Sequence, residues 1–235
     1  MSNLTADARC VIEKRIKRRV NGEFLFDTLG LDQVYIAGSS LRAEPANDID
    51  LYPVNRQDFV GLDLVLKDKG IQYSGTKNAI TVEYDGRVYQ FCSYHKDSLE
   101  DLVNSFDYAH VQIGAKIKKD SESFGFLGFD KLYMSEEFQS AQVLQRTWFT
   151  GSGYPLSSLL RLPKYIERGF FSGSSYKIEM LKAMSSVVDR GFEDYEDFKD
   201  QLDAVDLGLV PEEISEASEY LTILFNSLNK NDAII

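Results

Sequence analysis

Two short β-prone runs near the start of the chain constrain its fold more than any other feature. They cover residues 33–37 and residues 48–52. Side chains alternate between the two faces of a strand, so Asp48 and Asp50 point the same way while Ile49 points into a core. The chain is therefore expected to contain a sheet that presents two carboxylates side by side.

The residues up to about position 130 mix strand and helix signals. Helical periodicity covers residues 6–29, with an end or a bend at Asn21-Gly22, and residues 58–69. Ser98 is a typical N-cap for a short helix, and Asp85-Gly86 is typical of a hairpin turn. Further strands are expected at residues 71–74, 79–84, 88–93 and 105–117.

From about residue 133 onward the pattern is mainly helical. Helices are expected at residues 138–150, 156–169, 176–190, 195–205 and 214–228. We therefore predict an α+β (α/β) fold, in which a mixed sheet of about five strands with flanking helices is followed by an α-helical unit. The predicted domains are residues 1–130 and residues 131–235.

Composition and charge exclude some classes of function. The formal net charge is −11, which argues against a surface that binds nucleic acid non-specifically as a whole. No apolar run is long enough to cross a bilayer and no signal-peptide pattern opens the chain, so we expect a cytoplasmic protein without a membrane partner. Cys10 and Cys92 have no metal-binding spacing.

Asp48 and Asp50 predict a cation site. Two carboxylates on one face of a strand repel each other, and hard oxygen ligands suit Mg²⁺ or Mn²⁺ shared with substrate phosphates. Gly38 lets a phosphate approach the backbone closely, and the hydroxyl and amide of Ser39 can hold it. The alternative is a solvated strand edge that carries two acids.

A strand ending in Gly38-Ser39, a spacer, and then Asp48-x-Asp50 on the next strand resembles the DNA polymerase β-like nucleotidyltransferase superfamily. The resemblance implies a nucleotidyltransferase-type sheet and a third carboxylate on a later strand. Asp107 matches that role, with Glu83 or Asp85 as the alternatives. One departure from the superfamily pattern concerns the residue after the Gly-Ser pair. Many members have an arginine or a glycine there, whereas this chain has Ser40-Leu41 and then Arg42.

Other stretches are similar to nucleotidyltransferase-like proteins that are common in bacteriophage genomes. They are residues 88–91, 98–103, 106–107, 159–165 and 168–170. The resemblance implies transfer of a nucleoside monophosphate from an NTP to an acceptor hydroxyl, with release of pyrophosphate. Asp48 and Asp50 would hold two Mg²⁺ or Mn²⁺ ions. Asp107 would complete the ligands of the ion that activates the acceptor. Gly38, Ser39 and Ser40 would contact the phosphates.

A second predicted nucleotide contact lies in the helical half. Arg161, Lys164, Tyr165 and Arg168 fall at helical spacing, where the cations could contact a triphosphate and the tyrosine could stack on a base or ribose. The alternative is a solvated basic face, and Pro163 leaves the helix geometry open. The basic cluster at residues 14–19 is interpreted as a solvated helix face.

The acceptor is left open by the sequence. An RNA end, a protein hydroxyl and a small molecule all fit, with a phage or host protein as a further partner and the host cytoplasm as the location if the chain is phage-encoded. The alternative function is a catalytically silent or virion-associated interaction protein that keeps the nucleotidyltransferase fold.

Overall fold

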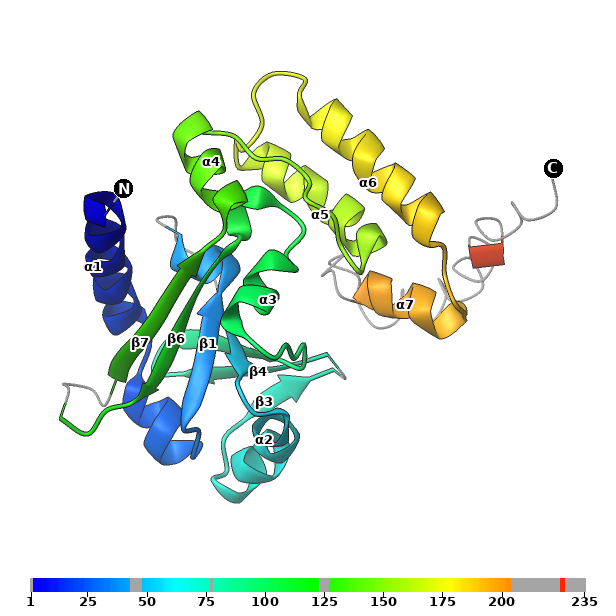
Figure 1. Ribbon diagram of the computed structural model, residues 1–235. Helices are drawn as coiled ribbons and strands as arrows, with labels where there is room; N and C mark the ends of the chain where they lie inside the picture. Colours follow the sequence, from blue (N-terminus) through cyan, green and yellow to red (C-terminus); the bar gives the residue numbers. More distant parts are fainter. Residues whose placement is uncertain (1, 43–47, 77, 123–126, 204–224, 227–235) are drawn as a thin grey trace. The chain divides into compact units, whose positions relative to one another are not determined.

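A computed structural model describes residues 2–42, 48–76, 78–122, 127–203 and 225–226 of the chain (Figure 1). The chain divides into two compact units, Met1–Leu144 and Gln145–Ile235. The first contains the sheet, and the described part of the second is mainly helical. The predicted α+β class is confirmed.

Seven strands form one mixed sheet in the order β3-β4-β5-β2-β1-β6-β7. They are β1 (Gln33–Ala37), β2 (Ile49–Pro53), β3 (Tyr73–Gly75), β4 (Ala79–Tyr84), β5 (Arg87–Cys92), β6 (Ile113–Lys119) and β7 (Leu127–Met134). Neighbours pair antiparallel except β2 and β5, which are parallel. The sheet therefore has two more strands than the five expected.

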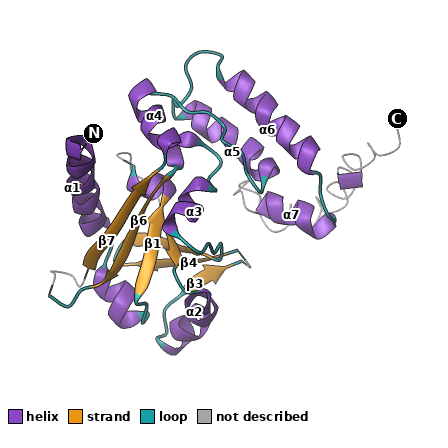
Figure 2. Cartoon of the chain, viewed as in Figure 1, coloured by secondary structure: helices purple, strands orange, loops and turns teal. Residues whose placement is uncertain are grey.

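Helices surround this sheet and make up the described part of the second unit (Figure 2). The first unit has α1 (Ser2–Arg19), the π-helical turn η1 (Glu23–Thr28), α2 (Arg56–Asp68), α3 (Leu99–Asn104), α4 (Glu136–Leu144) and the 3-10 turns η2 (Gly38–Leu41) and η3 (Ala109–Val111). The second has α5 (Pro155–Glu167), α6 (Tyr176–Arg190) and α7 (Tyr195–Asp203). As predicted, the N-terminal helix ends before Asn21-Gly22.

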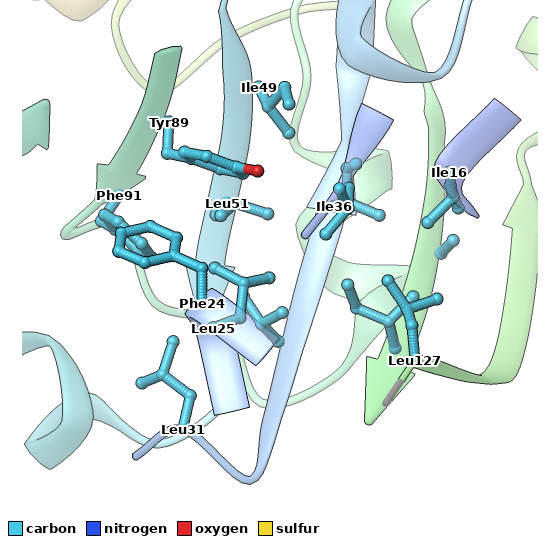
Figure 3. Close-up of a cluster of buried hydrophobic side chains, with 14 of the residues drawn as sticks. Ile16, Phe24, Leu25, Leu31, Ile36, Ile49, Leu51, Tyr89, Phe91 and Leu127 are labelled. Atoms are coloured by element: carbon cyan, nitrogen blue, oxygen red, sulfur yellow. The ribbon is translucent and has the colours of Figure 1, made fainter. Parts of the chain in front are cut away.

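One face of the sheet carries the main hydrophobic core (Figure 3). Ile16 of α1 and Phe24 of η1 pack there with strand residues such as Ile36, Leu51 and Phe91, all at most 1% exposed. Burying such side chains stabilises the fold by roughly 1.5–3 kcal/mol each. Because Leu51 faces this core, its neighbours along β2 must face the opposite side.

The opposite face of the sheet is partly covered by α3. Leu99 and Val103 of this helix cluster with Tyr35 and Ala37 of β1. The helix comes so close to β6 that a Cβ on Gly114 would lie 2.6 Å from Val103 Cγ2. The Ser98 side chain accepts the N–H of Asp101, which confirms the predicted N-cap.

The segment before β6 corrects the predicted strand at residues 105–117. Strand structure begins only at Ile113, because the chain first continues the end of α3 as turns and then forms η3. The Gln112 side chain holds these turns by donating to the Phe106 carbonyl, and it accepts the Ser135 hydroxyl. Asp107 therefore lies in a bend and not on a strand.

The domain boundary expected near residue 130 falls inside β7, whereas the division between the two compact units lies after Leu144 in the sequence. β7 joins the sheet through seven residue pairs with β6, so the chain cannot leave the sheet before Met134. Most of the helix predicted at residues 214–228 lies outside the described residues. Across the described chain, no helix combines the length and the apolar composition that a bilayer crossing requires.

Candidate active site

The turn that follows β1 needs a glycine at its first position. Gly38 has φ +73°, in the left-handed region that residues with a side chain disfavour. Space is not the reason, because a Cβ there would make only an ordinary contact, 3.8 Å from the Phe106 ring. Backbone conformation thus explains the glycine at position 38, where the chain turns directly after the end of the central strand β1.

The Ser40 side chain joins this turn to β2. Ser40 is buried, and its hydroxyl accepts the Asp50 N–H at 2.8 Å and donates to Asp50 Oδ2 at 3.3 Å. The two bonds fix the Asp50 carboxylate relative to the turn. In this structure the Ser40 hydroxyl therefore positions a carboxylate, and the nucleotide contact predicted for Ser40 stays a prediction.

Asp50 lies on the face of β2 that the main core does not cover, and Asp48 lies in the bend just before β2, which begins at Ile49 and not at the predicted residue 48. Ile49 and Leu51 are buried in that core, whereas both aspartates are partly exposed. Both carboxylates act on the Cys92 thiol on neighbouring β5: burial raises the pKa of Cys92 most, and the charges of Asp50 and Asp48 raise it further. Both aspartates therefore lie near Cys92, and their joint role as a cation site stays a prediction.

The residue before Asp107, Phe106, connects the segment of Asp107 to the glycine turn. The Phe106 ring lies against Gly38, and its centroid is 6.0 Å from that of Tyr52, which follows Asp50 on the same face of β2. Asp107 itself is buried, 3% exposed, between α3 and η3. The segment that carries it therefore borders the turn, although not on the predicted strand.

The carboxylate pair fits a divalent ion that is shared with a substrate. Within the described ranges, no three or more His, Cys, Asp or Glu side chains form a group that could hold a metal, so Asp107 does not complete such a group with Asp48 and Asp50. Mg²⁺ is commonly bound by one or two carboxylates together with substrate phosphates and water. The donor set therefore suits Mg²⁺ or Mn²⁺ with a nucleotide, and Asp107 as a third ligand stays a prediction.

Two arginines of the N-terminal basic cluster donate hydrogen bonds to backbone carbonyls of the η2 turn. Arg19 Nη1 donates to the Ser40 carbonyl at 2.8 Å, and Arg15 Nη1 donates to the Leu41 carbonyl. Sequence reasoning interpreted this cluster as a solvated helix face and missed them. Their spacing of four residues shows only that they share a face of α1, since the carbonyls they bind lie more than twenty residues away.

The predicted contacts in α5 divide between two environments. Lys164 and Arg168 are exposed, Arg161 is partly buried, and Tyr165 is 7% exposed with its ring edge-on to Phe170. The buried stripe of the helix passes through Tyr165, so this ring does not share a solvent-facing side with Lys164. The nucleotide contacts of this helix stay predictions.

Comparison with solved structures finds CCA-adding enzymes. A CCA-adding enzyme in complex with CTP matches with a TM-score of 0.50 and 14% identity over 81% of this chain and 48% of its own. The Thermotoga maritima CCA-adding enzyme complexed with tRNA matches at 0.49 and 14% over 91% and 55%, and a tRNA-processing enzyme at 0.46 and 14% over 86% and 52%. The chain spans about half the length of these enzymes.

The similarity is one of fold. At 14% identity the comparison shows a shared fold, and the superfamily expected from the Gly-Ser and Asp-x-Asp pattern stays a prediction. No family model and no curated protein matches the sequence, so these comparisons give the resemblance to bacteriophage proteins no support.

Proposed function

We propose that this chain is a metal-dependent nucleotidyltransferase that transfers a nucleoside monophosphate from an NTP to an acceptor hydroxyl and releases pyrophosphate. The observation that carries the proposal is the pair of hydrogen bonds between Ser40 and Asp50, which fixes a carboxylate beside the glycine turn that follows the central strand β1. The fold similarity to a CCA-adding enzyme in complex with CTP supports an NTP as substrate.

Asp48 and Asp50 would hold the Mg²⁺ or Mn²⁺. When bound, the ion would offset phosphate charge and lower the pKa of the acceptor hydroxyl. The chain itself contributes rigidity, because the Ser40 hydroxyl and the β2 backbone keep the Asp50 carboxylate in one orientation. Such preorganisation avoids reorganising the site during the reaction.

Gly38 and Ser39 are the proposed phosphate contacts. Gly38 is buried and has the left-handed conformation, and Ser39 is partly exposed beside it. Asp107 is proposed to act on the acceptor side, next to the ion that Asp48 and Asp50 would hold. Lys164, Arg161 and Tyr165 are proposed to bind the nucleotide from α5.

Three classes of acceptor fit this chemistry: an RNA end, a protein hydroxyl and a small molecule. A direct test incubates the protein with each α-labelled NTP, Mg²⁺ or Mn²⁺, and RNA, protein extract or small-molecule pools. We expect label to move to one class of acceptor, with Asp50→Asn as the inactive control. Absence of both label transfer and metal-dependent NTP binding in the wild-type protein would refute the proposal.

A catalytically silent or virion-associated interaction protein is the second candidate. It is favoured by one observation: no group of three metal-binding side chains occurs in the part of the chain that the structure describes. Such a protein could bind an NTP without transferring it to an acceptor and could dock a phage or host protein. Tight NTP binding without transfer to any acceptor class would select this candidate.

A further inference from the structure

The basic residues of α1 divide into two sets. Lys14 and Arg18 are exposed, whereas Arg15 and Arg19 are partly buried and reach the η2 turn. The apolar side of the same helix, with Ile16 at 1% exposed, is packed in the main core. The helix is thus anchored by its apolar side and places one pair of guanidinium groups at the turn.

The two guanidinium groups satisfy carbonyls at the end of η2. The last carbonyls of a helix have no partner within it, and burial without one costs roughly 1–3 kcal/mol. Ser40 and Leu41 are each 1% exposed, and Arg19 and Arg15 donate to their carbonyls. Bonds with a charged donor are stronger than neutral ones, so they hold this buried backbone firmly.

Hydrogen bonds connect Arg19 through Ser40 to Asp50. Arg19 holds the Ser40 carbonyl, and the Ser40 hydroxyl holds both the N–H and the carboxylate of Asp50. A chain of three residues therefore links α1 to the proposed metal ligand. Burial lowers the pKa of Arg15 and the neighbouring charge of Arg19 lowers it further, which shows two like charges gathered behind one short turn.

We infer that Arg15 and Arg19 are positioning residues of the nucleotide site, which fix the η2 turn and, through Ser40, Asp50. The inference rests on the proposed function, because the η2 turn is the proposed phosphate contact. The arginines are not proposed to touch the ion. They set the shape of the turn and add positive charge behind the place where phosphates would bind.

The test compares substitutions that remove equal charge from the same helix. Arg19→Gln removes the donor to the Ser40 carbonyl, and Arg18→Gln removes an exposed guanidinium. Binding of each of the four NTPs is titrated with Mg²⁺ present. We expect the Kd to rise about 10-fold in Arg19→Gln and less than about two-fold in Arg18→Gln. Arg19→Lys, which keeps charge and a donor, should recover part of the loss.

A second measurement does not depend on the nucleotide. The amide of Asp50 is held by the Ser40 hydroxyl, so its hydrogen exchange reports whether the turn is fixed. We expect faster exchange in Arg19→Gln and no change in Arg18→Gln. Equal Kd and equal exchange in the two variants would overturn the inference, and if Arg19→Gln does not fold, Arg19→Lys carries both measurements.

The two proposals fail differently. If the wild-type protein binds none of the four NTPs, the proposed function fails, and Asp50 exchange alone decides whether the arginines hold the turn. If the wild-type protein binds nucleotide and the Arg19 and Arg18 variants behave alike, the proposed function stands and the positioning role is lost.

Discussion

The η2 turn of the first unit and helix α5 of the second each contain predicted nucleotide contacts. Sequence spacing predicted the arrangement of side chains better at the turn than in the helix. At the turn, Ser40 and Asp50 are joined by hydrogen bonds, and Asp48 lies in the bend just before the strand that carries Asp50. In α5, Lys164 is exposed and Tyr165 is buried, although both were expected on one binding face.

The difference follows from the geometry of strands and helices. A strand has two faces, so one buried neighbour decides where the next side chain points. A helix presents residues around its full circumference, and spacing alone does not show which arc is buried. Functional residues on a strand are therefore more safely predicted than residues on a helix whose packing partners are unknown.

The largest expected effect is that of Asp50→Asn, which tests the turn directly. The substitution keeps the shape of the side chain and removes the charge that would hold the ion. We expect nucleotide transfer to fall by about 10³-fold, since such an ion supplies several kcal/mol to the transition state. Mg²⁺ should raise the melting temperature of the wild-type protein and not of this variant. A metal response that persists in the variant would contradict the site.

Asp107→Asn sharpens the comparison within the first unit. The described residues place Asp107 outside any three-ligand group, so the Asp48 and Asp50 pair should still bind the ion in this variant. We expect the Mg²⁺-dependent rise in melting temperature to persist while transfer falls about 10²-fold. Unchanged transfer with a lower melting temperature would make Asp107 a structural residue.

Lys164→Ala tests whether α5 takes part at all. A charge-assisted bond to phosphate contributes roughly 1.5–3 kcal/mol, so the Kd for NTP should rise about 10-fold or more. The matched control is Lys177→Ala, which removes an exposed lysine of α6. The Mg²⁺ response of the free protein should stay as in the wild type. Equal NTP affinity in the two variants would separate α5 from nucleotide binding.

The smallest effect concerns the stability of the second unit. Arg190 forms a two-bond pair with Asp197, at 2.7 and 2.9 Å, and this bond lowers the pKa of Asp197 below its ordinary value near 3.8. A lowered pKa contributes stability above the unfolded value, and the contribution is lost as pH falls through the folded value. We expect Arg190→Ala to lose about 1 kcal/mol at pH 7, measured by urea unfolding.

The same measurement at low pH completes this test. Below the folded pKa of Asp197 the carboxyl is neutral in both proteins, so the difference between wild type and Arg190→Ala should shrink. A difference that stays constant as pH falls from 7 to below the folded pKa of Asp197 would show that Arg190 acts through packing and not through the ion pair.

Local sequence predicted those parts of the fold whose contacts are local. β1 and β4 have the expected residues, and Asp85 and Gly86 both have positive φ in the hairpin turn between β4 and β5. Turn chemistry and alternation are properties of a few neighbouring residues. This part of the fold could therefore be read without knowing any tertiary contact.

The missed parts depend on distant partners. β7 is a strand because it pairs with β6, and its own sequence includes Gly128 and Asp130, which disfavour strands. The turns around Asp107 depend on a bond from Gln112, whose side chain is itself held by Ser135. Arg15 and Arg19 were missed for the same reason, since their partners lie in another element.

The place of β1 in the sheet has a consequence for the synthesis of the protein. β1 pairs with β2 on one side and with the much later β6 on the other. While a ribosome makes the intervening residues, β1 can have only one partner, and its other edge stays open to pairing with foreign strands. A nascent or truncated chain that ends before Ile113 should therefore aggregate readily, and the candidate site can mature only after β6 has closed that edge.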